Sequence, residues 1–147
     1  MKRIGVLNGP NLSLLGTREP DVYGTATLAD AETLARQAAA DERMELARFL
    51  QVEGEGELIT AVHAARGVED GLIINPGALT HYSLALADAI AAIELPTVEV
   101  HLSNVYARES FRARSVVSPV VRGVISGLGI AGYGLAVRAL ADILRAS

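Results

Sequence analysis

Short apolar runs recur along the chain, and five of them predict β-strands. The third and fourth runs, at 72–74 and 98–100, are apolar at most positions, as strands buried on both faces of a parallel sheet should be. We therefore expect strands at Arg3–Asn8, Glu45–Gln51, Gly71–Asn75, Thr97–Val100 and Gly123–Ser126.

Segments with helical spacing of apolar and polar residues lie between these runs. We expect helices over about Thr27–Ala40, Gly54–Arg66, Tyr82–Ile93 and Gly132–Ala146. Because strands and helices alternate throughout, the pattern predicts one α/β domain over residues 1–147 with a parallel sheet. The expected fold is flavodoxin-like, with a five-stranded sheet of order 2-1-3-4-5 and helices on both faces.

The segment between the first expected strand and the first expected helix is unusually long and polar. It carries two amides (Asn8 and Asn11), a guanidinium (Arg18) and a phenol (Tyr23). A simple strand-to-helix connection takes about 2–6 residues, so we interpret residues of about 12–24 as a lid or binding loop. It follows the carboxyl end of a strand, where open α/β sheets bind ligands.

Polar side chains also follow the third and fourth expected strands, at the same edge of the sheet. Glu99 and His101 alternate along one strand, so both point to one face. A carboxylate beside an imidazole fixes its tautomer and favours the protonated ring, which suits a general acid. A structural salt bridge fits the same spacing equally well. Arg108 and Arg112 would share one face of a helix and suit a carboxylate or phosphate ligand, although a solvated basic face is the alternative.

Two further residues have both a functional and a structural interpretation. A phenol has an unperturbed pKa of about 10, so Tyr23 would need a cation nearby, such as Arg18 or Arg108, to act as a base at neutral pH. Packing of the loop against the body of the protein is the alternative. His81 is expected at the start of the helix near Tyr82, either on the rim of the site or exposed to water.

Composition narrows the possible chemistry. The net charge is −4 with no basic block, which argues against a nucleic-acid partner. No apolar run reaches about 18 residues and no signal pattern is visible, so we expect no membrane partner and a cytoplasmic location. The only lysine, Lys2, precedes the first strand, and there is no cysteine, which argues against imine and thiolate chemistry. The three histidines lack metal-ligand spacing, so we expect neither metal nor cofactor.

A series of motifs runs from one end of the chain to the other: Asn8-Gly-Pro-Asn-Leu, Leu14-Leu-Gly-Thr-Arg-Glu-Pro, Tyr23-Gly, Glu55-Gly-Glu-Leu, Ile74-Asn-Pro-Gly-Ala, Thr80-His, Glu99-Val-His-Leu-Ser-Asn, Ala107-Arg-Glu, Phe111-Arg, Gly127-Leu-Gly and Gly132-Tyr. In this order and at this spacing, they resemble the type II 3-dehydroquinate dehydratases. The resemblance implies dehydration of 3-dehydroquinate to 3-dehydroshikimate by anti elimination through an enolate, without metal or cofactor. This reaction serves the shikimate pathway or quinate catabolism.

The resemblance also implies roles for individual catalytic residues. Tyr23 would remove the proton from C2, and Arg18 would hold it as the tyrosinate. Asn11 would help to hold a water at the enolate oxygen. His101 would protonate the departing C1 hydroxyl, and Glu99 would orient its imidazole.

Other residues are implied to bind the substrate. Asn75, His81 and Arg112 would hold its hydroxyl groups. The backbone amides of Leu102 and Ser103 would take its carboxylate.

Two more implied roles involve closure of the site and assembly. Arg108 would belong to the charge network that closes the lid. Asp88 would reach the site of a neighbouring subunit in a trimer. Four such trimers would form a homododecamer.

Four positions depart from the usual pattern of the family: Val52, Glu53, Tyr82 and Tyr106. An extra anion at Glu53 is expected either to pair with a lid arginine or to repel an anionic substrate. These departures leave open a catalytically silent paralogue that binds a related cyclic hydroxy acid. A flavin binder is disfavoured because the first loop has no Ser/Thr-rich phosphate nest, and a receiver domain because Asn8 and Asn75 replace the acidic residues it needs.

Overall fold

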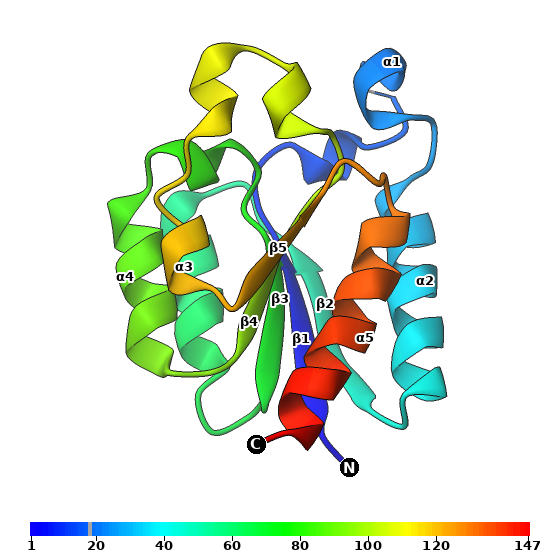
Figure 1. The fold of residues 1–147 in the computed structure, drawn as a ribbon, viewed down its shortest axis with the longest axis vertical. Coiled ribbons are helices and arrows are strands. Elements are labelled where there is room, and N and C mark those ends of the chain that lie inside the picture. The colour runs from blue at the N-terminus through cyan, green and yellow to red at the C-terminus, as the bar shows by residue number, and fades with distance from the viewer. Residues whose placement is uncertain (18) are drawn as a thin grey trace.

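The computed structural model describes residues 1–17 and 19–147; Arg18 and the side chain of Tyr23 lie outside the described residues. Five parallel strands form one sheet in the order β2-β1-β3-β4-β5 (Figure 1). They are β1 (Arg3–Asn8), β2 (Glu45–Gln51), β3 (Gly71–Asn75), β4 (Thr97–His101) and β5 (Gly123–Ser126). The predicted flavodoxin-like order is therefore confirmed, and only β4 ends one residue later than expected.

Two helices cover each face of the sheet (Figure 1). On one face α2 (Leu28–Asp41) packs beside α5 (Ala131–Arg145), and on the other α3 (Glu55–Ala64) packs beside α4 (Leu84–Ile93). The buried apolar residues accordingly form two clusters, one on each side of the sheet. Among the described residues, no helix is both long and apolar enough to cross a membrane.

The start of α4 differs from the expectation. The Ser83 hydroxyl accepts a hydrogen bond from the Leu86 N–H at 3.1 Å, so Ser83 caps the helix and Leu84 is its first residue. The preceding residues form a separate 3₁₀ helix, η2 (Gly77–His81). His81 therefore ends η2 instead of opening the long helix, because the chain turns between the two.

The long connection after β1 contains two short helical segments. These are the 3₁₀ helix η1 (Leu12–Leu14) and the helix α1 (Pro20–Tyr23), which begins with proline and is followed by Gly24, where φ is 77°. Three more 3₁₀ helices follow β4: η3 (Val105–Ala107), η4 (Ser110–Ala113) and η5 (Ser118–Val120). In Figure 1, α1 and the yellow segment that holds η3 and η4 stand beyond the carboxyl ends of the strands, where the sequence predicts the site.

A buried ion pair lies in another part of the molecule. The side chain of Glu69, just before β3, is fully buried and receives two hydrogen bonds from the Arg48 guanidinium, including one from Nη2 to Oε2 at 2.9 Å. Nη2 of Arg48 also donates to the carbonyl of Ala61 at 3.1 Å. This pair ties β2 to α3 and to the segment that enters β3.

Candidate active site

The loops that follow β1 and β3 pack backbone against backbone. Gly9 N–H donates to the Asn75 carbonyl at 2.8 Å. A side chain at Gly9 would place its Cβ 2.8 Å from the Pro76 carbonyl oxygen, so only glycine fits there. Gly77 has φ of +58°, and a Cβ on it would lie 3.2 Å from the Pro10 oxygen. These two glycines bring the two strand ends into one site.

A buried hydrogen-bonded triad forms the floor beneath these loops. The hydroxyl of Tyr133, fully buried on α5, donates to Asn8 Oδ1 at 2.6 Å and accepts from Asn75 Nδ2 at 3.0 Å. Asn75 Oδ1 in turn accepts from Gly77 N–H at 3.2 Å. Burial raises the pKa of Tyr133, although the bond from Asn75 acts against the rise. The triad therefore fixes which end of the Asn75 amide faces each neighbour.

A cavity of about 260 Å³ lies above this floor. Its walls come from the segments that follow β1, β3 and β4, as the sequence predicts. The described residues that line it are Pro10, Asn11, Leu12, Asn75, Gly77, Ala78, His81, His101, Leu102, Ser103, Val105, Arg108 and Arg112. They include two guanidiniums and two imidazoles but no carboxylate, so this lining favours an anionic ligand.

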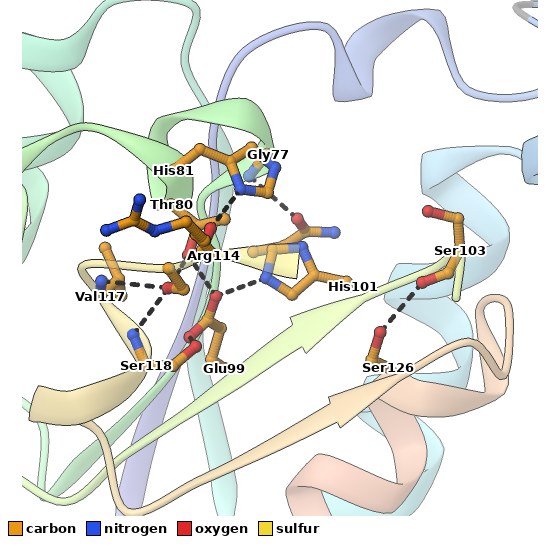
Figure 2. A network of polar contacts seen from close by, with 12 residues as sticks. Gly77, Thr80, His81, Glu99, His101, Ser103, Arg114, Val117, Ser118 and Ser126 are labelled. Carbon is orange, nitrogen blue, oxygen red and sulfur yellow. Dashed lines mark hydrogen bonds and ion pairs between the residues drawn. The ribbon is translucent and has the colours of Figure 1, made fainter. Parts of the chain in front are cut away.

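Glu99 and His101 form a pair at the end of β4 (Figure 2). His101 Nε2–H donates to Glu99 Oε2, and the Glu99 side chain is fully buried while the imidazole lines the cavity. Because Nε2 bonds to the carboxylate, Nδ1 is the other ring nitrogen available for proton transfer. The predicted contact between the Glu99 carboxylate and the His101 imidazole is confirmed, and the imidazole lines the cavity.

Two hydroxyl groups complete the surroundings of Glu99 (Figure 2). Thr80 donates to Oε2 at 2.6 Å and Ser118 donates to Oε1 at 2.7 Å. Burial acts to raise the pKa of Glu99, but hydrogen bonding and charge attraction from His101, with the two hydroxyl bonds, outweigh it and leave the pKa lowered. The carboxylate is thus held ionised beside the imidazole. The Ser115 oxygen lies 2.6 Å from that of Thr80 and extends the network.

His81 is oriented by a backbone carbonyl. Its Nδ1–H donates to the Arg114 oxygen at 2.7 Å, which leaves Nε2 as the second ring nitrogen (Figure 2). The ring of Phe111 meets the imidazole edge-on at 6.0 Å between centroids. His81 lines the cavity, so it can offer Nε2 to a ligand hydroxyl.

Arg108 and Arg112 reach the cavity from different local structures. The two residues do not share a helix, because Arg108 has an extended backbone between η3 and η4. Nη1 of Arg108 donates to the Ser103 hydroxyl at 3.2 Å. Nε of Arg112 donates to Glu109 at 3.0 Å, and its guanidinium lies 4.9 Å from the Phe111 ring centroid. The expectation of one helical face is wrong, yet both guanidiniums line the same cavity.

Not every predicted residue is brought into this cavity. Asp88 is exposed on α4 and is not among the described lining residues. Arg18 and the side chain of Tyr23 lie outside the described residues. Among the described residues, no cluster of histidine and acidic side chains suits a metal ion.

The structure also adds residues that sequence reasoning missed. The supporting groups are the hydroxyls of Thr80, Ser115, Ser118 and Tyr133. Thr80 and Tyr133 lie inside the motifs Thr80-His and Gly132-Tyr, so the motifs themselves were a usable signal. Ser118 contacts Glu99 from 19 residues away and Ser115 contacts Thr80 from 35 residues away, so neither contact follows from local spacing.

Comparisons with known proteins give the same picture over nearly the whole chain. A family model described as dehydroquinase class II matches residues 2–141. A 3-dehydroquinate dehydratase of Jannaschia sp. is 57% identical over 143 residues, which cover 97% of this chain and 96% of the relative. One from Bacillus subtilis is 54% identical over 135 residues, covering 92% of this chain and 90% of the relative.

Solved structures agree with these relatives. The crystal structure of the type II dehydroquinase from Propionibacterium acnes superposes with a TM-score of 0.91 at 42% identity, covering 97% of each chain. A 3-dehydroquinate dehydratase-like protein from Bifidobacterium longum reaches 0.72 at 31% identity, covering 99% of each chain. With the same strand order and a cationic cavity beside the Glu99–His101 pair, this chain belongs to the class II dehydroquinase family.

Proposed function

We propose that this chain catalyses the dehydration of 3-dehydroquinate to 3-dehydroshikimate, the hydro-lyase step of the shikimate pathway. Membership of the class II dehydroquinase family supports the reaction. The observation that carries it is the buried Glu99 carboxylate, which accepts a hydrogen bond from His101 at the wall of a cavity lined by cationic side chains. That arrangement provides an acid for a leaving hydroxyl and a place for an anionic substrate.

In the proposed reaction, His101 gives its proton to the C1 hydroxyl, which leaves as water. Glu99 is a positioning residue, because it contacts the imidazole and not the cavity. Its negative charge stabilises the imidazolium before proton transfer, and its two hydroxyl partners hold it in place. In this scheme His101 is the general acid, and Glu99 fixes the orientation of its imidazole.

The lid of residues 12–24 is proposed to supply the base that removes the substrate proton. Tyr23 is proposed to remove the C2 proton with Arg18 beside it, and the resulting enolate would be stabilised through a water held by Asn11. Electrostatic stabilisation of such an oxyanion is typically worth several kcal/mol. Closure of the lid would exclude bulk water and strengthen these contacts.

The substrate carboxylate is proposed to bind at the backbone amides of Leu102 and Ser103, which line the cavity at the end of β4. Asn75, His81 and Arg112 would hold the ring hydroxyls. The orientation of His81 by the Arg114 carbonyl supports this role, because it leaves Nε2 for the ligand. No metal or cofactor enters the scheme.

Assembly would complete the site. Asp88 is exposed on α4 and does not line the cavity of its own chain, which supports the proposal that it reaches a neighbouring subunit's site. A trimer would bring it there, and four trimers would form the proposed dodecamer. Arg108 would join the lid-closing network, and the location is proposed to be cytoplasmic.

Turnover of 3-dehydroquinate tests the function directly. The purified protein should produce the conjugated enone, seen as rising ultraviolet absorbance, and borohydride pre-treatment should leave the rate unchanged because no imine forms. A folded protein that binds quinate-like ligands without turnover would instead support the silent paralogue.

Tyr23→Phe tests the base. We expect kcat to fall by about 10²–10⁴-fold, the range typical of a lost general base, with the melting temperature unchanged. Tyr82→Phe is the matched control, because Tyr82 is 64% exposed and does not line the described cavity; it should retain the wild-type rate. A near-wild-type rate for Tyr23→Phe would refute the assignment.

A further inference from the structure

The carboxylate of Glu53, which follows the end of β2, accepts hydrogen bonds from three different residues. Oε1 accepts from the Asn11 N–H at 2.8 Å. Oε2 accepts from the Ser13 hydroxyl at 2.8 Å and from Gln51 Nε2 at 3.0 Å. Gln51 Nε2 also donates to the Gly9 carbonyl at 3.0 Å. Together these bonds fasten residues 9–13 to the end of β2.

The fastened segment includes a residue with unusual backbone geometry. Asn11 has φ of 69° and ψ of −4°, a left-handed conformation that few residues other than glycine adopt, although asparagine does so more often than most. Its N–H points to Glu53, and Asn11 and Leu12 line the cavity. Glu53 therefore contacts the segment after β1 that lines the cavity, just before and at the start of the lid.

We propose that Glu53 is a positioning residue, which holds the Asn11–Ser13 segment so that Asn11 is preorganised for the transition state. The inference rests on the proposed function, in which Asn11 helps to stabilise the enolate oxygen. Glu53 is not among the cavity-lining residues, so its effect passes through Asn11.

The nature of the donors explains why a carboxylate suits this position. All three are neutral, and together they need two acceptor oxygens, whereas an amide side chain has only one. The bond from the Asn11 amide, followed by those from Ser13 and Gln51, lowers the pKa of Glu53, so the carboxylate remains ionised at neutral pH. The two expectations for Glu53, pairing with a lid arginine or repelling the substrate, stay predictions, because the lid arginine Arg18 lies outside the described residues.

Glu53→Ala and Glu53→Gln test the proposal, with Glu57→Ala as the control. Glu57 lies four residues further on and also accepts a backbone N–H, that of Gly54 at 3.1 Å, but has no described bond to the lid region. Each variant is assayed with 3-dehydroquinate for kcat and KM. Backbone hydrogen–deuterium exchange is measured over residues 9–17 and over the strands.

Glu53→Ala should exchange faster over residues 9–17 but not in the strands, and kcat should fall about tenfold to a hundredfold with little change in KM. Glu53→Gln keeps one acceptor and should fall between alanine and wild type. Glu57→Ala should match wild type in kcat and in exchange over residues 9–17.

The outcomes separate this proposal from the proposed function. Unchanged exchange, or an unchanged kcat in an active enzyme, would overturn the positioning role of Glu53. A lower melting temperature with unchanged kcat would also overturn it, since that result describes a purely structural residue. A wild-type protein that does not turn over 3-dehydroquinate would refute the proposed function, while exchange in Glu53→Ala would still decide whether the segment is anchored.

Discussion

Glu99 and Glu69 are both buried carboxylates paired with a basic side chain, yet Glu99 lies beside the cavity and Glu69 lies away from it. Glu99 accepts from an imidazole and two hydroxyls beside the cavity. Glu69 accepts twice from the guanidinium of Arg48, and neither residue lines the cavity. Arginine stays charged at all ordinary pH values, whereas imidazole changes charge near neutrality. Burial alone therefore does not identify a functional carboxylate. The basic residue paired with it and its position beside the cavity do.

Loss of the His101 imidazole should have the largest effect on kcat, and it tests whether the Glu99 pair serves catalysis. His101→Ala should lower kcat by about 10²–10⁴-fold because it removes the proposed proton donor, while the circular dichroism spectrum stays that of the folded protein. His63→Ala, which truncates an exposed histidine on α3, is the matched control and should keep full activity. Wild-type turnover in His101→Ala would make the Glu99 pair structural, like that of Glu69.

Loss of Glu69 should have the opposite signature. Glu69→Ala leaves the Arg48 side chain, which is only 23% exposed, without its carboxylate, and should lower the free energy of unfolding by about 3 kcal/mol. The kcat of the folded fraction should not change. Chemical denaturation and an assay at low temperature measure the two quantities.

A double variant sharpens that result. Replacing both members, as in Arg48→Met with Glu69→Met, removes the unpaired charge and should recover most of the stability. A fall in kcat for folded Glu69→Ala would show that this ion pair also serves the site, and would contradict the contrast.

The smallest expected effect concerns stability at low pH. The pKa of Glu99 is lowered in the folded protein, so its contribution to stability is present above the unfolded pKa of about 4.3 and is lost as pH falls through the folded pKa. Compared with Glu99→Gln, the wild type should lose relative stability as pH falls from neutrality to about 3. Urea midpoints of both proteins across this range provide the measurement, and a pH-independent difference would contradict it.

The sequence predicted the ends of β1, β2, β3 and β5 correctly. β1 and β3 are buried almost throughout, so their apolar runs are a strong signal. β2 and β5 are only partly buried, and their position follows from the regular alternation of strands and helices. The observed α4 starts at Leu84, two residues after the expected start at Tyr82, because the Ser83 hydroxyl caps the helix.

The site was predictable where one strand carries its residues, and not where distant loops meet. Glu99 and His101 share a strand face, so their contact follows from period-two geometry. The contact of Ser118 with Glu99 spans 19 residues, and that of Glu53 with Asn11 spans 42, so neither follows from local spacing. Glu53 was identified as a departure from the family pattern, but its partners required the fold.

Ionisation of the Tyr133 hydroxyl can be followed by ultraviolet absorbance. The chain has no tryptophan and four tyrosines, and Tyr133 is buried between Asn8 and Asn75 with a raised pKa. In the unfolded chain that phenol ionises near pH 10, whereas in the folded protein it stays neutral, so the free energy of unfolding falls as the pH rises above about 10. Phenolate absorbance from Tyr133 would thus appear together with the loss of the floor that aligns Asn75.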